Sequence, residues 1–129
     1  MDDFIEILRV VGKKPAFYLT PKKDGDSKSI SHLRTFICGI QVGQHLKHDT
    51  SILDSFTFWV CHHYGVPDGA RDWSGHLLKQ AGGDESEAFR LFFQHFEEYV
   101  KERETIGAEA IKARFIMMLE RIRKGADAT

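Results

Sequence analysis

The stretch Asp84–Val100, DESEAFRLFFQHFEEYV, decides the fold that this sequence predicts. Its large apolar residues recur at intervals of three and four, at Phe89, Phe92, Phe93, Phe96, Tyr99 and Val100. This spacing places them on one face of an α-helix. Asp84 is suited to cap the first turn, with Glu87 in the capping-box position. We therefore expect a long amphipathic helix with a buried aromatic stripe, and with acidic residues on its opposite face and at its end: Glu97, Glu98, Glu102 and Glu104.

Further segments on both sides repeat this helical spacing, at residues 3–11, 31–45, 51–64, 72–81 and 108–124. Turn-forming sequences separate several of them, including Gly65–Gly69 and Gly82-Gly83. No segment alternates apolar and polar residues at the period of two that a strand requires. The sequence predicts an all-α fold, a single-domain bundle of five to six helices over residues 1–129.

The connections and ends give more local expectations. Gly12 is predicted to end the first helix, and residues 13–28 are predicted to form an exposed, lysine-rich loop with Phe17 or Tyr18 in the core. Such a loop suits contact with an acidic partner or phosphate, or serves solubility alone. The last helix is predicted to bury an apolar stripe, and residues 125–129 to fray. The members of that stripe are Ile111, Phe115, Met118, Leu119 and Ile122.

Composition limits the class of protein. Eighteen Lys and Arg against nineteen Asp and Glu give a formal net charge of −1, whereas proteins that bind nucleic acid non-specifically are usually strongly basic. A content of 42% hydrophobic and 29% charged residues is typical of a globular domain. No apolar run is long enough to span a membrane, and the first residues, MDDFIEILRVVGKK, lack the basic start of a signal peptide. We expect a cytoplasmic protein with Cys38 and Cys61 as reduced thiols.

Histidine and cysteine residues, which commonly bind metals or act in catalysis, are present but lack the spacing that these roles require. His45 and His48 are three apart, and Cys61, His62 and His63 are adjacent, so neither group has the spacing of a zinc site. Both cysteines fall within apolar helices, where thiols are usually inert. There is no glycine-rich nucleotide motif. The sequence predicts no metal, no cofactor and no catalytic residue, and hence no enzyme.

Binding candidates are easier to find. Arg71 and Trp73 are of residue types enriched at binding hot spots, although Trp73 also suits packing of its short helix. An alternative is a small helical enzyme or ligand-binding domain with a pocket lined by His62, His63 and His76. Another is a homodimeric adaptor that uses the helix face shared by Gly39 and Gly43.

Several segments together resemble a group of small helical bacterial proteins, the immunity partners of polymorphic toxins. They are Lys14–Leu19 (KPAFYL), Ser29–Gly39 (SISHLRTFICG), Phe56–Val60 (FTFWV) and Glu85–Phe93 (ESEAFRLFF), with Trp73 between the last two. The resemblance spans about residues 4–100. This chain departs from the group's pattern at Lys14, at Ala16-Phe17 and at Ile40.

The resemblance implies a non-enzymatic cytoplasmic protein that binds a cognate toxin and occludes its active site. It implies no catalytic residues, no direct contact with nucleic acid and no membrane association, and we expect a monomer. An acidic patch would complement a basic toxin cleft. We therefore predict that Glu97, Glu98 and Glu102 together contact the toxin.

Overall fold

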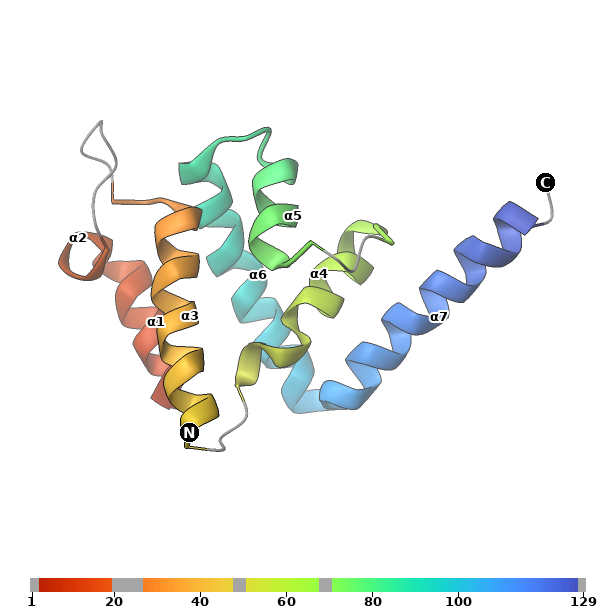
Figure 1. Cartoon of the computed structure of the whole chain (residues 1–129), viewed down its shortest axis with the longest axis horizontal. Coiled ribbons are helices and arrows are strands. Elements are labelled where there is room, and N and C mark those ends of the chain that lie inside the picture. Colours follow the sequence, from red (N-terminus) through yellow and green to blue (C-terminus); the bar gives the residue numbers. More distant parts are fainter. Residues whose placement is uncertain (1–2, 20–26, 48–50, 68–70, 128–129) are drawn as a thin grey trace.

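The computed structural model describes residues 3–19, 27–47, 51–67 and 71–127, and this part of the chain is all-helical (Figure 1). It contains seven α-helices and one 3-10 turn, which confirms the all-α class and slightly exceeds the predicted number of helices. In chain order the elements are α1 (Asp3–Lys13), α2 (Pro15–Tyr18), α3 (Ile30–Leu46), η1 (Ile52–Ser55), α4 (Phe56–Tyr64), α5 (Trp73–Gln80), α6 (Glu85–Ile106) and α7 (Ala108–Asp127).

Helix α6 organises the core, and its predicted apolar stripe is confirmed. Its buried residues are Ala88, Phe89, Phe92, His95, Phe96, Tyr99 and Val100. The Phe56 ring of α4 packs against several of their rings, with centroids 5.5 Å from Phe92 and 5.1 Å from Tyr99. The buried Tyr99 hydroxyl donates to the Ile52 carbonyl, and burial raises the pKa of Tyr99 to about 12.

Side-chain caps start two of the central helices, and the cap predicted at Asp84 is confirmed. Asp84 accepts hydrogen bonds from the backbone N–H groups of Ser86 (2.9 Å) and Glu87 (3.0 Å) at the start of α6. Ser29 likewise accepts from the N–H of His32 at the start of α3. The Ser29 hydroxyl also donates to Glu85 across 3.1 Å, so the N-terminal ends of α3 and α6 are joined. Caps of this kind stabilise a helix by about 1 kcal/mol each.

The N-terminal segment corrects two predictions. Helix α1 continues through Gly12 to Lys13, so Gly12 does not end the helix. A Cβ built at Gly12 would lie 2.7 Å from Cε1 of Phe93 on α6. Phe17 and Tyr18 do not enter the core and are 79% and 48% exposed.

Leu19 is the buried residue of this segment instead. Pro15 starts the single turn of α2, whose C-terminal neighbour Leu19 donates its N–H to the Pro15 carbonyl at 2.8 Å. Leu19 is 5% exposed. The predicted lysine-rich loop is thus partly helical at residues 15–18, and its residues 20–26 lie outside the described residues.

Helix α7 leaves the body of the protein as an arm (Figure 1). Its first part packs on α4, with Ile111 and Phe115 buried. The predicted burial of Ile122 is wrong, since this residue lies beyond the body and is 42% exposed. Residues 125–127, where the sequence predicts fraying, continue the helix in the structure, and residues 128–129 lie outside the described residues.

Candidate functional site

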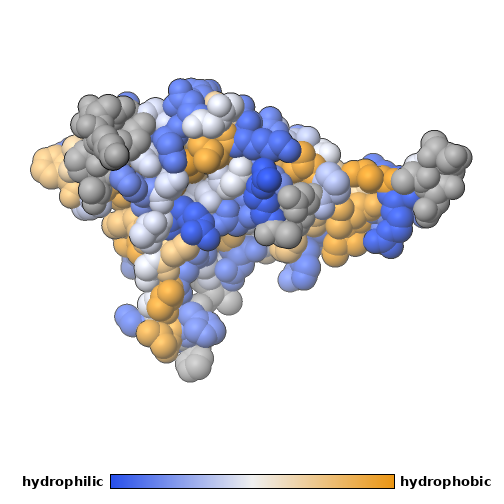
Figure 2. All heavy atoms as spheres, turned by 45° about the horizontal axis from the view of Figure 1, so that its top comes forward, coloured by the Kyte–Doolittle hydropathy of each residue, from blue (hydrophilic) through white to orange (hydrophobic). Residues whose placement is uncertain are grey.

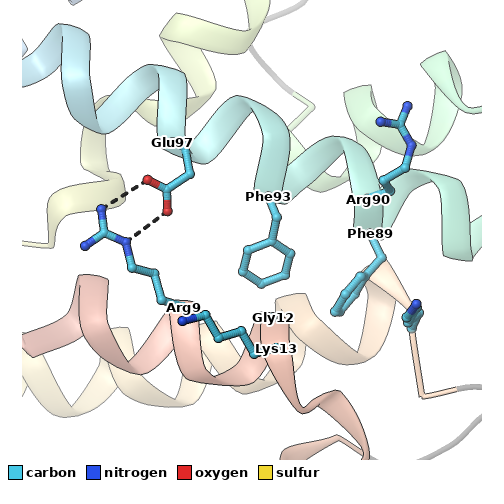
Figure 3. Close-up of a pocket in the computed structure, with 8 residues that line it drawn as sticks. Arg9, Gly12, Lys13, Phe89, Arg90, Phe93 and Glu97 are labelled. Carbon is cyan, nitrogen blue, oxygen red and sulfur yellow. Dashed lines mark hydrogen bonds and ion pairs between the residues drawn. The ribbon is translucent and has the colours of Figure 1, made fainter.

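A groove of about 520 Å³ lies between α1 and α6, and we call it the α1–α6 groove (Figure 3). Helix α6 contributes Phe89, Arg90, Phe93 and Glu97. The other side is formed by Arg9, Gly12, Lys13 and Lys28. No local pattern in the sequence indicates this groove, because its residues come from separate helices.

The floor of the α1–α6 groove is apolar. Phe89 and Phe93 are one helical turn apart on α6, and their ring centroids are 5.1 Å apart. Gly12 lies opposite them, and its lack of a side chain leaves room for the Phe93 ring. The contact between Gly12 and the Phe93 ring therefore sets the width of the groove at this point.

The rim of the groove is predominantly basic. The Arg9 guanidinium donates to both carboxylate oxygens of Glu97, at 2.9 and 3.0 Å, and also to Glu6 at 2.9 Å. These hydrogen bonds from Arg9 lower the pKa of Glu97. Arg90 is held in turn by Glu87 and by Gln94 on α6. Arg9 and Arg90 are therefore oriented at the two ends of the groove by contacts within the chain.

A second hollow, of about 400 Å³, adjoins the groove, and we call it the α2 hollow. It shares Lys13 and Lys28 with the α1–α6 groove and adds residues from α2 and its flanks. Among these, Phe17 is strongly exposed, and the Lys14 ammonium lies 5.8 Å from the centre of its ring. The predicted lysine-rich segment thus borders a surface that continues onto α6.

The three predicted acidic contacts do not share one open face. Glu97 faces α1 and binds Arg9. Glu102 forms an ion pair with Arg114 of α7 and accepts from the indole N–H of Trp59 at 3.4 Å. Glu98 lies 3.2 Å from Nδ1 of His95. Each carboxylate has a partner within the chain, and Glu97 faces away from Glu98 and Glu102, which are about one turn apart on the same side of α6.

Trp73 and Arg71 have different surroundings. Trp73 is 6% exposed and packs between Phe56 and Phe92, with ring centroids 5.9 and 4.9 Å away. This supports the packing interpretation of Trp73. Arg71 is exposed, and its side chain covers Gly75, where an added Cβ would lie 2.5 Å from Cγ of Arg71.

The three histidines of the alternative pocket are only partly brought together. His62 and His63 line a hollow of about 260 Å³ with Trp59, Glu102 and Arg114. Burial, followed by the charge of Arg114, lowers the pKa of His62. His76 is not part of this hollow: it is buried, with Nε2 3.4 Å from the Cys61 sulfur.

A partly buried polar network next to this hollow joins α4 and α6, and no local pattern in the sequence indicates the complete network. The Tyr64 hydroxyl is hydrogen-bonded to Nε2 of His95 at 2.5 Å, and Nδ1 of His95 contacts Glu98. Burial, followed by the neighbouring His63, lowers the pKa of His95. The signal in the sequence was the pair His95 and Glu98, three residues apart on one helix, but nothing local identified Tyr64 as the third member.

The face with Gly39 and Gly43 on α3 is exposed, and no other described element crosses it: a Cβ added at either glycine meets nothing within 4 Å. Val42 and Leu46 are on the same face and are 60% and 75% exposed.

In the described ranges, no group of three or more His, Cys, Asp or Glu side chains could hold a metal ion. No helix there combines the length and apolar character needed to cross a membrane.

Comparison with protein-family models, with curated proteins and with solved structures finds no match to this chain. The functional conclusion therefore depends on the geometry of the site and on the resemblance described above.

Proposed function

We propose that this chain is a non-enzymatic, immunity-type protein of the bacterial cytoplasm, which binds a cognate toxin domain and neutralises it by occluding its active site. The observation that carries the proposal is the α1–α6 groove, with an apolar floor and a basic rim on two packed helices. A binding site of this type combines a desolvated anchor with charges that orient the partner.

The surroundings of the groove add support. The groove is built on helices with buried stripes, so little ordering would be needed when a partner docks. Exposed aromatic residues continue the surface along α2, at Phe17 and Tyr18. Tyrosine in particular is enriched at the centres of protein interfaces.

The test begins with capture of tagged protein from a lysate of its own organism, followed by mass spectrometry. The captured protein's C-terminal domain is then expressed alone and together with this chain. We expect that the domain alone stops growth, that co-expression restores growth, and that an equimolar amount of this chain inhibits the purified domain. If growth stops equally with and without this chain, the proposal is wrong.

A second candidate, a homodimeric adaptor, is favoured by the exposed face of α3. Gly39, Val42, Gly43 and Leu46 follow the spacing of one helical face and are all exposed. Small residues on such a face allow two helices to approach closely. Light scattering of the eluted protein separates a dimer from a monomer, and Val42→Glu would dissociate a dimer formed through this face.

A further inference from the structure

The charge of the groove surface differs from that of the whole chain. Of the described residues that line the α1–α6 groove and the α2 hollow, five are cations, Arg9, Lys13, Lys14, Lys28 and Arg90, and Glu97 is the single carboxylate. The chain as a whole has a formal net charge of −1. Positive charge is therefore concentrated along this surface.

The carboxylates at the groove are paired with its two arginines, so the positive charge of this surface comes mainly from Lys13, Lys14 and Lys28. Glu97 is engaged by Arg9, while Glu6 and Glu87, which lie outside the lining, hold Arg9 and Arg90 in place. Lys13 and Lys28 lie where the groove meets the α2 hollow, and both are exposed. A ligand that crosses this junction passes over both ammonium groups.

The apolar floor determines which anionic ligand fits. Phe93, which is half-buried, provides the accessible part of a surface on which an aromatic or large aliphatic side chain would be desolvated, and Phe89, only 4% exposed, lies beside it. A nucleic-acid backbone would bring phosphates close to the Glu97 carboxylate, which is repulsive. A peptide can place carboxylates over the lysines and an apolar side chain over the phenylalanines.

We propose that the α1–α6 groove binds an acidic segment of the partner protein, with one aromatic or large aliphatic side chain on Phe89 and Phe93 and with flanking carboxylates paired to Lys13 and Lys28. The inference deepens the proposed function, because it names the surface and the chemistry by which the partner is held. It also reverses the polarity of the contact expected from Glu97, Glu98 and Glu102.

The direct test uses synthetic peptides and the full chain. The probe is a fluorescein-labelled peptide with a central phenylalanine and leucine flanked on each side by glutamates, and its control replaces every glutamate with lysine. Fluorescence anisotropy is expected to show binding of the acidic peptide alone, and this binding weakens as salt is added. A mixed-sequence single-stranded oligonucleotide serves as the competing anionic probe.

The variant for this test is Lys13→Glu with Lys28→Glu, and its matched control is Lys79→Glu with Lys101→Glu. All four lysines are exposed, so circular dichroism and thermal unfolding are expected to match those of the native chain. Lys79 and Lys101 lie on α5 and α6 and line neither the groove nor the α2 hollow. The groove variant is expected to bind the acidic peptide at least about tenfold more weakly, while the control keeps the native affinity.

Three outcomes would overturn the inference. The first is that the acidic peptide does not bind at about 1 mM, the weak end of specific recognition. The second is that both double variants bind the peptide equally. The third is that the oligonucleotide binds more tightly than the peptide. The growth assay separates this inference from the proposed function. Rescue from the toxin by the Lys13→Glu, Lys28→Glu variant would retain the proposed function and reject the groove as its contact surface. Peptide binding without any rescue by the native chain would do the reverse.

Discussion

Helices α6 and α7 have similar lengths, 22 and 20 residues, and both carry an apolar stripe along one face. The stripe of α6 is covered by α3, α4 and α5 from its first turn to Val100, apart from the half-buried Phe93, which lines the groove. The stripe of α7 is covered only at its start, where Ile111 and Phe115 pack on α4 and η1. Further along, Met118 and Leu119 are half-buried and Ile122 is exposed, and Figure 2 shows hydrophobic side chains along the arm.

The regular spacing of apolar residues therefore identifies the face of a helix that favours burial, but it does not identify the element that covers this face. Helix α6 is surrounded because the chain folds back on it from both directions. Helix α7 follows Gly107, whose φ of 85° redirects the chain after α6. Its last turns thus extend past the end of α4 (Figure 1), and residues 120–125 are exposed.

The largest expected effect is at the centre of α6. Phe96→Ala removes a fully buried ring that stacks on Phe92 at 5.5 Å, and it should lower the free energy of unfolding by about 3–5 kcal/mol. Urea denaturation measures this loss. Ile116→Ala on α7, where the side chain is 44% exposed, is the control and should change stability by less than about 1 kcal/mol. Equal losses at the two sites would show that α7 is covered in solution.

The second expected effect is a dependence of stability on pH that originates at His95 of α6. Its folded-state pKa lies below the ordinary 6.5, chiefly because of burial, so the unfolded chain binds the proton more readily. The stabilisation is therefore complete above pH 6.5 and is lost as the pH falls through the folded-state pKa. His62 contributes in the same direction.

This pH effect is measured as the urea midpoint against pH, and a single group contributes at most about 1.4 kcal/mol per pH unit. His95→Gln should flatten the profile below pH 6.5 relative to the native chain. Gln94→Ala, an exposed neighbour without a titrating group, should leave it unchanged. A native profile that is flat from pH 7 to pH 5 would contradict the assignment to buried histidine.

A smaller effect is expected at the N-terminus of α6. Asp84→Ala removes the acceptor for the N–H groups of Ser86 and Glu87, and it should lower stability by about 1 kcal/mol. Thermal unfolding detects this change. Asp84→Asn keeps a capping oxygen and should retain most of the stability. If Asp84→Asn loses as much stability as Asp84→Ala, the negative charge of Asp84, not its capping hydrogen bonds, stabilises the helix.

The smallest expected effect is on the distal arm. Ile122→Ala should change the free energy of unfolding by less than about 0.5 kcal/mol, because the side chain is already 42% exposed. Hydrogen exchange gives the sharper comparison, since amides of residues 120–127 should exchange through local fraying and those of residues 92–100 only on global unfolding. Strong protection of the arm would indicate an association that covers it.

Local chemistry in the sequence was enough to predict the all-α fold. The cap at Asp84, the cap at Ser29 and the aromatic stripe of α6 all depend on residues within a few positions of each other. Gly12 was misinterpreted because a glycine that ends a helix and a glycine that admits a ring from another helix look the same in one dimension. Phe17 and Tyr18 were expected in the core because their size favours burial, but the single turn of α2 directs Leu19 inward instead.

The candidate site was less accessible to sequence reasoning. Arg9 and Glu97 are 88 positions apart, so local spacing does not predict their ion pair. It therefore does not show that Glu97, expected to contact a toxin, is already bound by Arg9. The sequence indicates that the lysine-rich segment suits an acidic partner. It does not indicate that Phe89 and Phe93 lie beside this segment. A groove between two helices depends on how they are placed, and that placement depends on residues far apart in the chain, such as Gly12 and Phe93.

The contact between Gly12 and Phe93 also constrains how this protein can diverge. A Cβ at position 12 would lie 2.7 Å from the Phe93 ring, so a side chain there requires that the ring move or shrink. Positions 12 and 93 should therefore change together during evolution: a descendant with alanine or serine at 12 needs a smaller residue at 93, or a ring turned into the groove. Because the same ring forms part of the groove floor, a substitution at this half-buried glycine would alter which partner the surface accepts without changing the charged residues on its rim.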